Sequence, residues 1–194
     1  MAQAFTPEQM QTIRARLMDS ARRHALTTGV RKTSLDTLTA EAGISKSSFY
    51  KFFDSKELLF LEVAAGWESQ VLAQAAGALS ECGDADNKAR AAAFVFSVFE
   101  AIHQLGIVRF MREDLPYLHA FFSEDAARTH CLNSAAAIFE RLRMAHIRFT
   151  EPDEVVLSVI QLMYLSILNI RDLGDNFFPA LRALVHSACD HLVA

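Results

Sequence analysis

Hydrophobic residues recur every three or four positions along most of this chain, which is the spacing of one face of an α-helix. The first such stretch opens at FTPEQM, where Thr6 is the expected N-cap and Pro7 the first helical residue. Its apolar stripe continues to Gly29. No strand-like alternation persists, and the sequence has 4 prolines and 7 glycines. The pattern therefore predicts an all-α protein of about nine helices.

Two short helices joined by a sharp turn are predicted in the segment TSLDTLTAEAGISKSSFYKFFDSK. We expect Thr33 to cap the first of them, with Asp36 as the reciprocal carboxylate. Gly43 follows, and a glycine there can adopt the left-handed conformation that ends a helix and turns the chain. Ser45 is the expected N-cap of a second helix that runs to Phe52. This arrangement is typical of a helix-turn-helix.

The second of these helices has an apolar side and a polar side. Phe49, Phe52 and Phe53 are predicted to face the interior. Short hydroxyls on the other side suit base edges in the major groove, while lysines suit phosphates. A solvated helical hairpin with ordinary capping serines is the alternative interpretation. The DNA-binding candidates are Ser45, Lys46, Ser47, Ser48, Tyr50, Lys51 and Lys56.

The segment GISKSSFYKFFDSKELLF resembles the operator-binding segment of the tetracycline-repressor (TetR) family of bacterial transcription regulators. The resemblance implies a helix-turn-helix domain over residues 1–56 and a helical effector-binding and dimerisation domain over residues 57–194. It also implies a DNA-backbone contact from Thr33 or Ser34. Two positions depart from the family pattern, which usually has Ala at Thr39 and often Tyr or His at Phe52. The positions that carry the pattern are Gly43, Ile44, Ser45 to Ser48, Phe49, Tyr50, Phe52, Phe53 and Lys56.

Charge is distributed unevenly along the chain. Up to Lys56 there are 9 Lys and Arg against 5 Asp and Glu, a net charge of +4, whereas the remainder has 10 against 18, a net charge of −8. Because phosphate binding depends on a local basic face, this favours a DNA contact in the amino-terminal part. The acidic remainder argues against a second nucleic-acid surface.

The later helices are predicted from the same periodicity and from their end signals. Gly106 and Pro116 are expected to end helices, whereas Ser123 and the segment Thr150–Asp153 are expected to begin them. In order, the predicted helices cover residues 56–79, a stretch around 94–102, a short piece at 107–112, a long helix from 123 to 145, one from 150 to before 174, and 177–192.

The helix predicted to begin near residue 150 is apolar on almost every side, so it must bury two faces. We expect one face to pack on the body and the other on the same helix of a second copy. The last helix would complete a four-helix packing across a two-fold axis, as in the resembled family. A central core helix in a monomer is the alternative. The expected dimer contacts are Ile160, Ile167, Leu168, Leu181, Leu184, Val185 and Ala188.

The body is rich in aromatic residues, and the resemblance implies that it holds an effector pocket. Apolar walls with a few polar groups are what a small apolar effector requires. Aromatic residues at helical spacing are more often core, so both interpretations stay open for each of them. The candidates are Trp67, Phe99, His103, Asn133, Gln161 and Tyr164.

Several kinds of site are not expected. His186 and Asp190 are four residues apart, but two ligands are too few for a metal site, and no cofactor or catalytic motif is recognisable. Cys82, Cys131 and Cys189 are widely spaced and odd in number, so we expect free thiols. No run is apolar enough to span a membrane, and the first residues lack a signal-peptide pattern. We therefore expect a cytoplasmic protein without a membrane partner.

Together these features predict a sequence-specific DNA-binding transcriptional regulator rather than an enzyme. The family default is a repressor that binds a double-stranded operator as a homodimer and is released by a small apolar ligand. The alternative is an all-helical small-molecule-binding or interaction protein without operator activity. Sequence-specific DNA binding is the property that separates the two.

Overall fold

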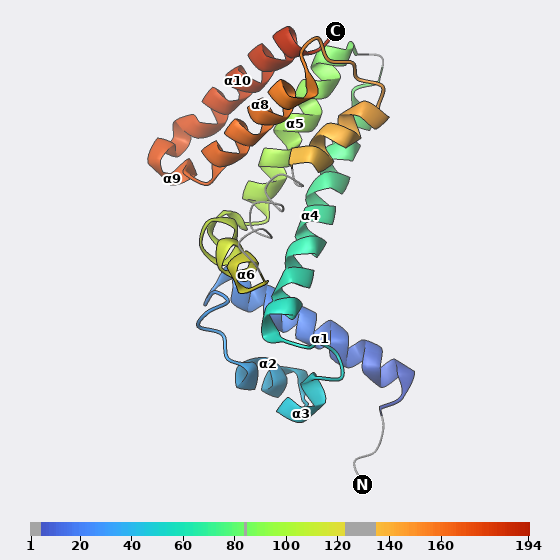
Figure 1. Ribbon diagram of the computed structural model, residues 1–194, viewed down its shortest axis with the longest axis vertical. Helices are drawn as coiled ribbons and strands as arrows, with labels where there is room; N and C mark the ends of the chain where they lie inside the picture. Colours follow the sequence, from blue (N-terminus) through green and yellow to red (C-terminus); the bar gives the residue numbers. More distant parts are fainter. Residues whose placement is uncertain (1–4, 84, 123–134) are drawn as a thin grey trace. The chain divides into compact units, whose positions relative to one another are not determined.

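The computed structural model describes residues 5–83, 85–122 and 135–194 (Figure 1). Its contacts divide the chain into two compact units. The head unit contains residues 1–67 and 109–122, and the body unit contains residues 68–108 and 123–194. The compact units therefore differ from the expected functional division, because residues 57–67 and 109–122 pack with the head. That DNA binding belongs to residues 1–56, and effector binding and dimerisation to residues 57–194, stays a prediction.

Helix α1, Pro7–Leu26, opens the head unit. Its predicted cap is confirmed, because the Thr6 hydroxyl accepts from the backbone N–H of Gln9 and the Gln9 side chain accepts from the N–H of Thr6. Such reciprocal bonds satisfy two of the N–H groups that a helix start leaves without partners. One face of the helix is buried, and it packs against α2, Leu35–Ala42.

The predicted cap of α2 is wrong by one residue. Ser34, not Thr33, is the N-cap, and its hydroxyl accepts from the N–H of Thr37 at 3.0 Å. The Thr33 hydroxyl instead donates to the carbonyl of Gly29 at 2.7 Å and is buried. The predicted left-handed turn is confirmed, because Gly43 ends α2 with φ of 73°.

Helix α3 is shorter than expected, covering Lys46–Phe49 and followed by turns to Phe52. Its cap is Ser45, as predicted. Helix α4, Lys56–Glu81, follows. The residue before it, Ser55, accepts from the N–H of Leu58 through its hydroxyl at 3.1 Å. The first turns of α4 belong to the head unit and its later turns to the body unit.

The second part of the head unit is a π-helical turn, Phe110–Asp114, which continues directly into α6, Leu115–Phe122. The expectation of a short helix stopped by Pro116 is wrong. Pro116 is the second residue of α6 and lies inside a continuous helical run, directly after the π-helical turn in which the Leu115 N–H donates to the Phe110 carbonyl. Phe110 packs edge-on against Trp67, with ring centroids 5.1 Å apart.

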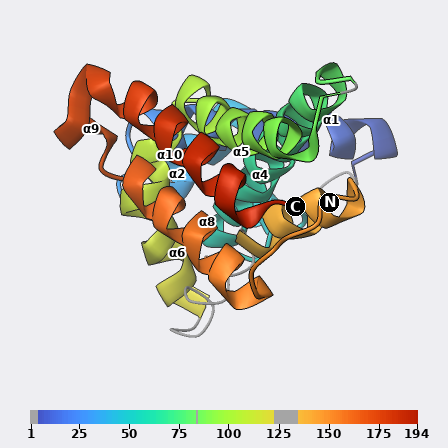
Figure 2. The same ribbon diagram turned by 90° about the horizontal axis from the view of Figure 1, so that it is seen from above.

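The body unit is also helical. Figure 2 shows α10, Phe177–Leu192, running between α5, Asn87–Gln104, and α8, Asp153–Ile167. The predicted last helix is thus confirmed. The predicted long helix from residue 123 begins outside the described residues, and residues 135–144 are helical.

The helix predicted to begin near residue 150 and end before residue 174 is divided in the structure. Helix α8 ends at Ile167, a short α9, Ile170–Leu173, follows, and a 3₁₀ turn over Gly174–Asn176 leads to α10. The expected capping box is also wrong, because the Thr150 hydroxyl donates to the carbonyl of His191 at 2.7 Å. Among the described residues no single helix has the length and hydropathy to cross a membrane; α8 and the stretch 170–192 pass that test only together, across a 71° bend.

Candidate nucleic-acid interface

The start of α3 carries a cluster of hydroxyl groups. The Ser45 hydroxyl accepts from the N–H of Ser48 at 3.3 Å, and it lies 2.9 Å from the Ser47 hydroxyl and 3.0 Å from that of Ser48. Ser45, Lys46 and Ser47 are exposed, and Ser48 is half-buried. These short side chains leave the amino-terminal end of the helix open to the edge of a base pair.

Aromatic side chains support this face from behind. Phe49 is fully buried and Phe53 nearly so, as predicted. Phe52 was also expected inside but is half-buried and packs on Phe5, with centroids 6.0 Å apart. Tyr50 is 58% exposed and stands edge-on to the Phe49 ring. A buried aromatic residue therefore fixes the orientation of an exposed one beside the hydroxyl cluster.

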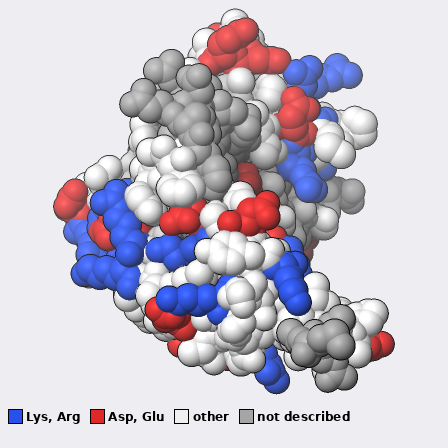
Figure 3. Space-filling model, turned by 60° about the horizontal axis from the view of Figure 1, so that its bottom comes forward, with Lys and Arg blue, Asp and Glu red and all other residues white. Residues whose placement is uncertain are grey.

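Positive charge surrounds the hydroxyl cluster. The Lys46 ammonium lies 2.8 Å from a carboxylate oxygen of Asp36, and both side chains are mostly exposed. Lys51 is exposed, with its ammonium 5.2 Å from the centroid of the Phe5 ring. Figure 3, which brings this end of the molecule forward, shows Lys and Arg side chains, with some Asp and Glu between them, around a largely uncharged centre. This arrangement suits a polyanion, since phosphates can replace the weakly held Asp36.

Two predicted DNA contacts have other roles in the structure. The Lys56 ammonium donates to the carbonyls of Val30 and Thr33 at 3.0 and 2.9 Å, and its side chain is only 18% exposed. The Thr33 hydroxyl donates to the carbonyl of Gly29, and its backbone N–H donates to the carbonyls of Gly29 and Val30, so both of its donors are engaged within the loop. Ser34 is exposed and caps α2. Sequence reasoning missed that Lys56 shapes the loop that carries Ser34.

Helices α1 and α2 are joined by a polar network centred on Glu41. Its carboxylate accepts from the Ser20 hydroxyl at 2.6 Å, pairs with Arg23 at 3.0 Å, and lies 3.0 Å from a ring nitrogen of His24. The Ser20 hydrogen bond, followed by that of His24, lowers the pKa of Glu41 to about 2. The network fixes α2, and thereby α3, on α1.

The comparisons with known proteins agree with this geometry. Residues 17–63 match the family model described as bacterial regulatory proteins, tetR family. The amino-terminal domain is that of the TetR family. The match covers α2, α3 and the start of α4, which are the elements that build the candidate interface. No curated protein matches the chain.

Solved structures share the TetR-family fold over nearly the whole chain. The regulator PfmR from Thermus thermophilus has a TM-score of 0.54 and 22% identity, covering 90% of this chain and 96% of its own. FadR from Bacillus subtilis, solved with stearoyl-CoA, has a TM-score of 0.60 and 14% identity, with coverage of 90% and 96%. RolR, solved with resorcinol, has a TM-score of 0.55 and 20% identity, with coverage of 94% and 89%.

Burial in the single chain divides the residues that were predicted for dimer contacts. Leu168 and Ala188 are half-buried, and Leu184 is 59% exposed. On α8, other apolar side chains point outward in this single chain, above all Leu162, which is 66% exposed, and Leu165, at 46%. The remaining predicted contacts are buried in the core of the body unit itself, where a partner could not reach them: Ile160, Ile167, Leu181 and Val185.

The predicted effector residues are divided between the two units. Trp67 belongs to the head unit, whereas Phe99 is fully buried in the body unit. His103 is exposed and stacks edge-on against Phe178 at 5.0 Å. Gln161 and Tyr164 are half-buried, and Asn133 lies outside the described residues. A small apolar cavity of about 30 Å³ lies among α5, α8 and α10.

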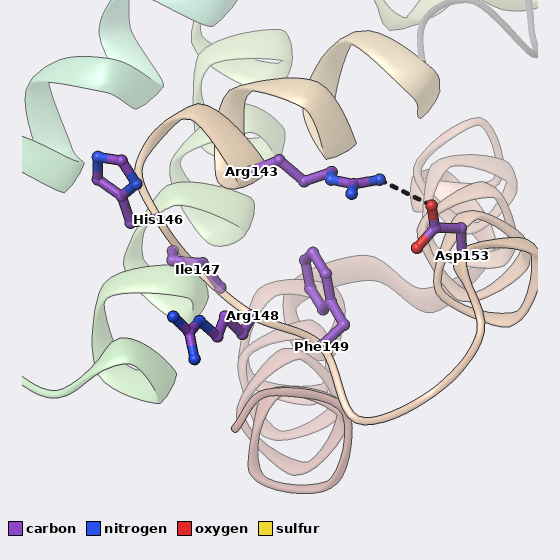
Figure 4. A pocket seen from close by; sticks show the side chains of 6 residues that line it. All are labelled: Arg143, His146, Ile147, Arg148, Phe149 and Asp153. Atoms are coloured by element: carbon purple, nitrogen blue, oxygen red, sulfur yellow. Dashed lines mark hydrogen bonds and ion pairs between the residues drawn. The ribbon is translucent and has the colours of Figure 1, made fainter.

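A larger hollow of about 620 Å³ lies beside residues 143–153 (Figure 4). It is polar, but its charges are not arranged to hold an anion. The Arg143 guanidinium pairs with Asp153 at 2.8 Å, and the side chains of His146 and Arg148 point away from that pair. His146 has φ of 62° and ends the helix of residues 135–144. Basic residues there complement the carbonyl end of the helix, so the hollow gives no evidence of a ligand site.

Proposed function

We propose that this protein is a sequence-specific DNA-binding transcriptional repressor rather than an enzyme. It binds an inverted-repeat operator as a homodimer and is released by a small apolar ligand. The observation that carries the proposal is the exposed side of α3, where Ser45, Lys46 and Ser47 stand in front of the buried Phe49. A solvated hairpin needs no such combination of open hydroxyls, local positive charge and a rigid aromatic support.

In this proposal the hydroxyls and Lys46 read base edges, whereas Lys51 and Ser34, of the pair Thr33 and Ser34, contact phosphates. Tyr50 lies beside them and contacts the DNA backbone. Lys56 acts mainly by shaping the loop before α2, because its ammonium already binds two carbonyl oxygens. A phosphate contact from Lys56 would require it to exchange one of these bonds.

Dimerisation is proposed through α8 and α10. Leu162 and Leu184 border a hollow of about 510 Å³ between the two helices, and both side chains are mostly exposed in the single chain. An exposed apolar surface that includes both helices is typical of a subunit interface. Two copies related by a two-fold axis would present their α3 helices to successive major grooves, about 34–36 Å apart or a multiple of that spacing.

Ligand release is the family-level part of the proposal. Two structures of the same fold were solved with small organic ligands, stearoyl-CoA and resorcinol. The cavity among α5, α8 and α10 is lined by apolar side chains, including Val95, Leu142 and Met163. At about 30 Å³ it is far below the roughly 300 Å³ of a typical ligand site, so a ligand would have to open it. A ligand that favours a non-binding arrangement by roughly 3 kcal/mol would lower operator affinity about 150-fold.

The experiment is a selection of DNA sequences from a random duplex pool, followed by gel shifts with the enriched duplex and with the DNA upstream of the protein's own gene. We expect an enriched inverted repeat that is bound in preference to a scrambled duplex of the same composition. A thermal-shift screen of apolar compounds then tests release of the operator. Enrichment of no motif would favour the alternative, an all-helical binding protein without operator activity.

A further inference from the structure

The loop between α1 and α2, residues 27–34, is held from two sides within the head unit. On one side is Lys56, whose ammonium donates to the carbonyls of Val30 and Thr33. On the other side is the π-helical turn, whose last residue, Asp114, lies 84 positions after Val30 in the sequence. The loop is therefore shaped by a segment that lies outside the helix-turn-helix sequence.

Asp114 makes the central contact. Its side chain is only 5% exposed, and its Oδ1 accepts from the backbone N–H of Val30 at 3.1 Å. Its Oδ2 is buried and has no hydrogen-bond partner among the described residues. A buried carboxylate with an unsatisfied oxygen lowers the stability of the folded chain. Its presence therefore calls for an explanation other than packing. A hydrophobic side chain would fill the space without that cost, but it could not accept from Val30.

Arg109 and Gly29 complete the contact. The Arg109 guanidinium donates to the carbonyl of Ala25 at 2.8 Å, at the end of α1. Gly29 has φ of +86°, and a Cβ atom there would lie 3.3 Å from both Arg109 Nη1 and Asp114 Oδ2. Arg109 immediately precedes the π-helical turn, and Asp114 ends it. Such turns are rare in proteins, and those that occur are often found at functional sites. The loop and the turn thus fit each other closely.

The loop carries groups that a DNA-binding head would use. Lys32 is exposed, and no ion pair involving it is found among the described residues. Ser34 caps α2, and Asp36 in the first turn of α2 pairs with Lys46 of α3. A displacement of the loop would therefore move Lys32 and the start of α2. It would also move Asp36, the partner of Lys46, which is proposed to read base edges.

Resting on the proposed function, we propose that Arg109 and Asp114 are positioning residues for DNA binding. They hold the α1–α2 loop so that Lys32 and the first turn of α2 meet the phosphate backbone. Neither residue touches DNA. Their effect passes through the Val30 N–H and the Ala25 carbonyl, which fix both ends of the turn before Lys32.

The test measures affinity for the selected operator at several salt concentrations. Asp114→Ala should lower affinity about tenfold and reduce the slope of log affinity against log salt by about one unit, because one phosphate contact is lost. Asp114→Asn keeps an oxygen that accepts from Val30 and should stay near wild type. Arg109→Met keeps the aliphatic stem and should also lower the affinity and the salt slope. It replaces Asp114→Ala in the test if that variant does not fold.

A double-mutant cycle separates positioning from a loss of stability. Lys32→Ala and Asp114→Ala should be strongly non-additive, since both remove the same phosphate contact. Ile13→Ala removes buried apolar volume from α1 away from the loop, so it should lower the melting temperature and leave the salt slope unchanged. Amide exchange at residues 29–34 should accelerate in Asp114→Ala and not in Ile13→Ala.

Three results would overturn the inference. The first is an Asp114→Ala variant with the affinity and salt slope of the wild type. The second is additive effects of Lys32→Ala and Asp114→Ala in the double-mutant cycle. The third is an Ile13→Ala variant whose salt slope falls as much as that of Asp114→Ala. Failure of the proposed function looks different, because the wild-type protein would then select no DNA sequence at all. A wild type that binds its operator, beside an Asp114→Ala variant that binds equally well, defeats this inference alone.

Discussion

Truncation of Leu162 to Ala should weaken the proposed dimer without weakening the subunit. Leu162 is on α8 and is 66% exposed in the single chain, so most of its side chain makes no contact within its own subunit. Ile160, two residues earlier, is only 5% exposed and belongs to the core of the body unit. The two residues therefore separate the contribution of an interface from that of a fold.

The magnitude follows from the exposed fraction. Complete burial of a leucine side chain stabilises by roughly 1.5–3 kcal/mol, so burying the exposed two-thirds of Leu162 would contribute about 1–2 kcal/mol per subunit. A two-fold interface contains the residue twice, which gives about 2–4 kcal/mol for the dimer. The dissociation constant of Leu162→Ala should therefore rise between about 30-fold and several hundredfold. Ile160→Ala should instead lower the free energy of unfolding by roughly 2–5 kcal/mol.

Sedimentation equilibrium over a range of concentrations measures the dissociation constant, and chemical denaturation measures the stability of the subunit. Met144→Ala is the matched control, because Met144 is an apolar side chain that is 73% exposed on the helix of residues 135–144. It should leave dimerisation unchanged. A Leu162→Ala variant that dimerises as tightly as wild type would refute the assignment of α8 to the interface, as would equal weakening by Met144→Ala.

Three further predictions concern the folded chain. Phe49→Ala should cost roughly 3–5 kcal/mol of head stability, measured by thermal unfolding, because a fully buried aromatic side chain is removed. The pKa of Glu41 is lowered from 4.5 to about 2. The stabilisation that the Glu41 carboxylate gives the folded chain is therefore complete above about pH 4.5 and is lost as the pH falls toward 2. Glu41→Gln should flatten this pH dependence of stability, as acid denaturation would show. Burial raises the pKa of the Cys189 thiol to about 11, so iodoacetamide at pH 8 should label Cys82 before Cys189, as peptide mass mapping would show.

Local signals explain what the sequence could predict. The caps at Thr6 and Ser45 and the left-handed Gly43 depend on side chains and backbone within a few residues, so they are readable from the sequence alone. Thr33 and Ser34 are adjacent hydroxyl residues that fit the same cap pattern. The choice between them is made by the conformation of the loop before α2, in which the Gly29 carbonyl accepts from the Thr33 hydroxyl and leaves Ser34 to cap α2.

Tertiary contacts explain what the sequence could not predict. Helix α8 is apolar on nearly every side, so periodicity could not show that Ile160 is buried and Leu162 exposed. Asp114 follows Glu113 in a charged stretch and is indistinguishable from an ordinary helix end until its contact with Val30, 84 residues away, is seen. The one available signal was a carboxylate between the apolar residues Phe110 and Leu118, both of which are buried.

Sequence-specific binding of DNA by α3 is the central claim, and a comparison of Lys46→Ala with wild type on two duplexes tests it most directly. The affinities are measured by fluorescence anisotropy on the selected inverted repeat and on a scrambled duplex of equal length. The wild type should prefer the inverted repeat by about 10³-fold or more, and Lys46→Ala should lose affinity mainly for the inverted repeat. Equal binding of the wild type to both duplexes, or an equal loss on both in Lys46→Ala, would contradict base reading by this helix.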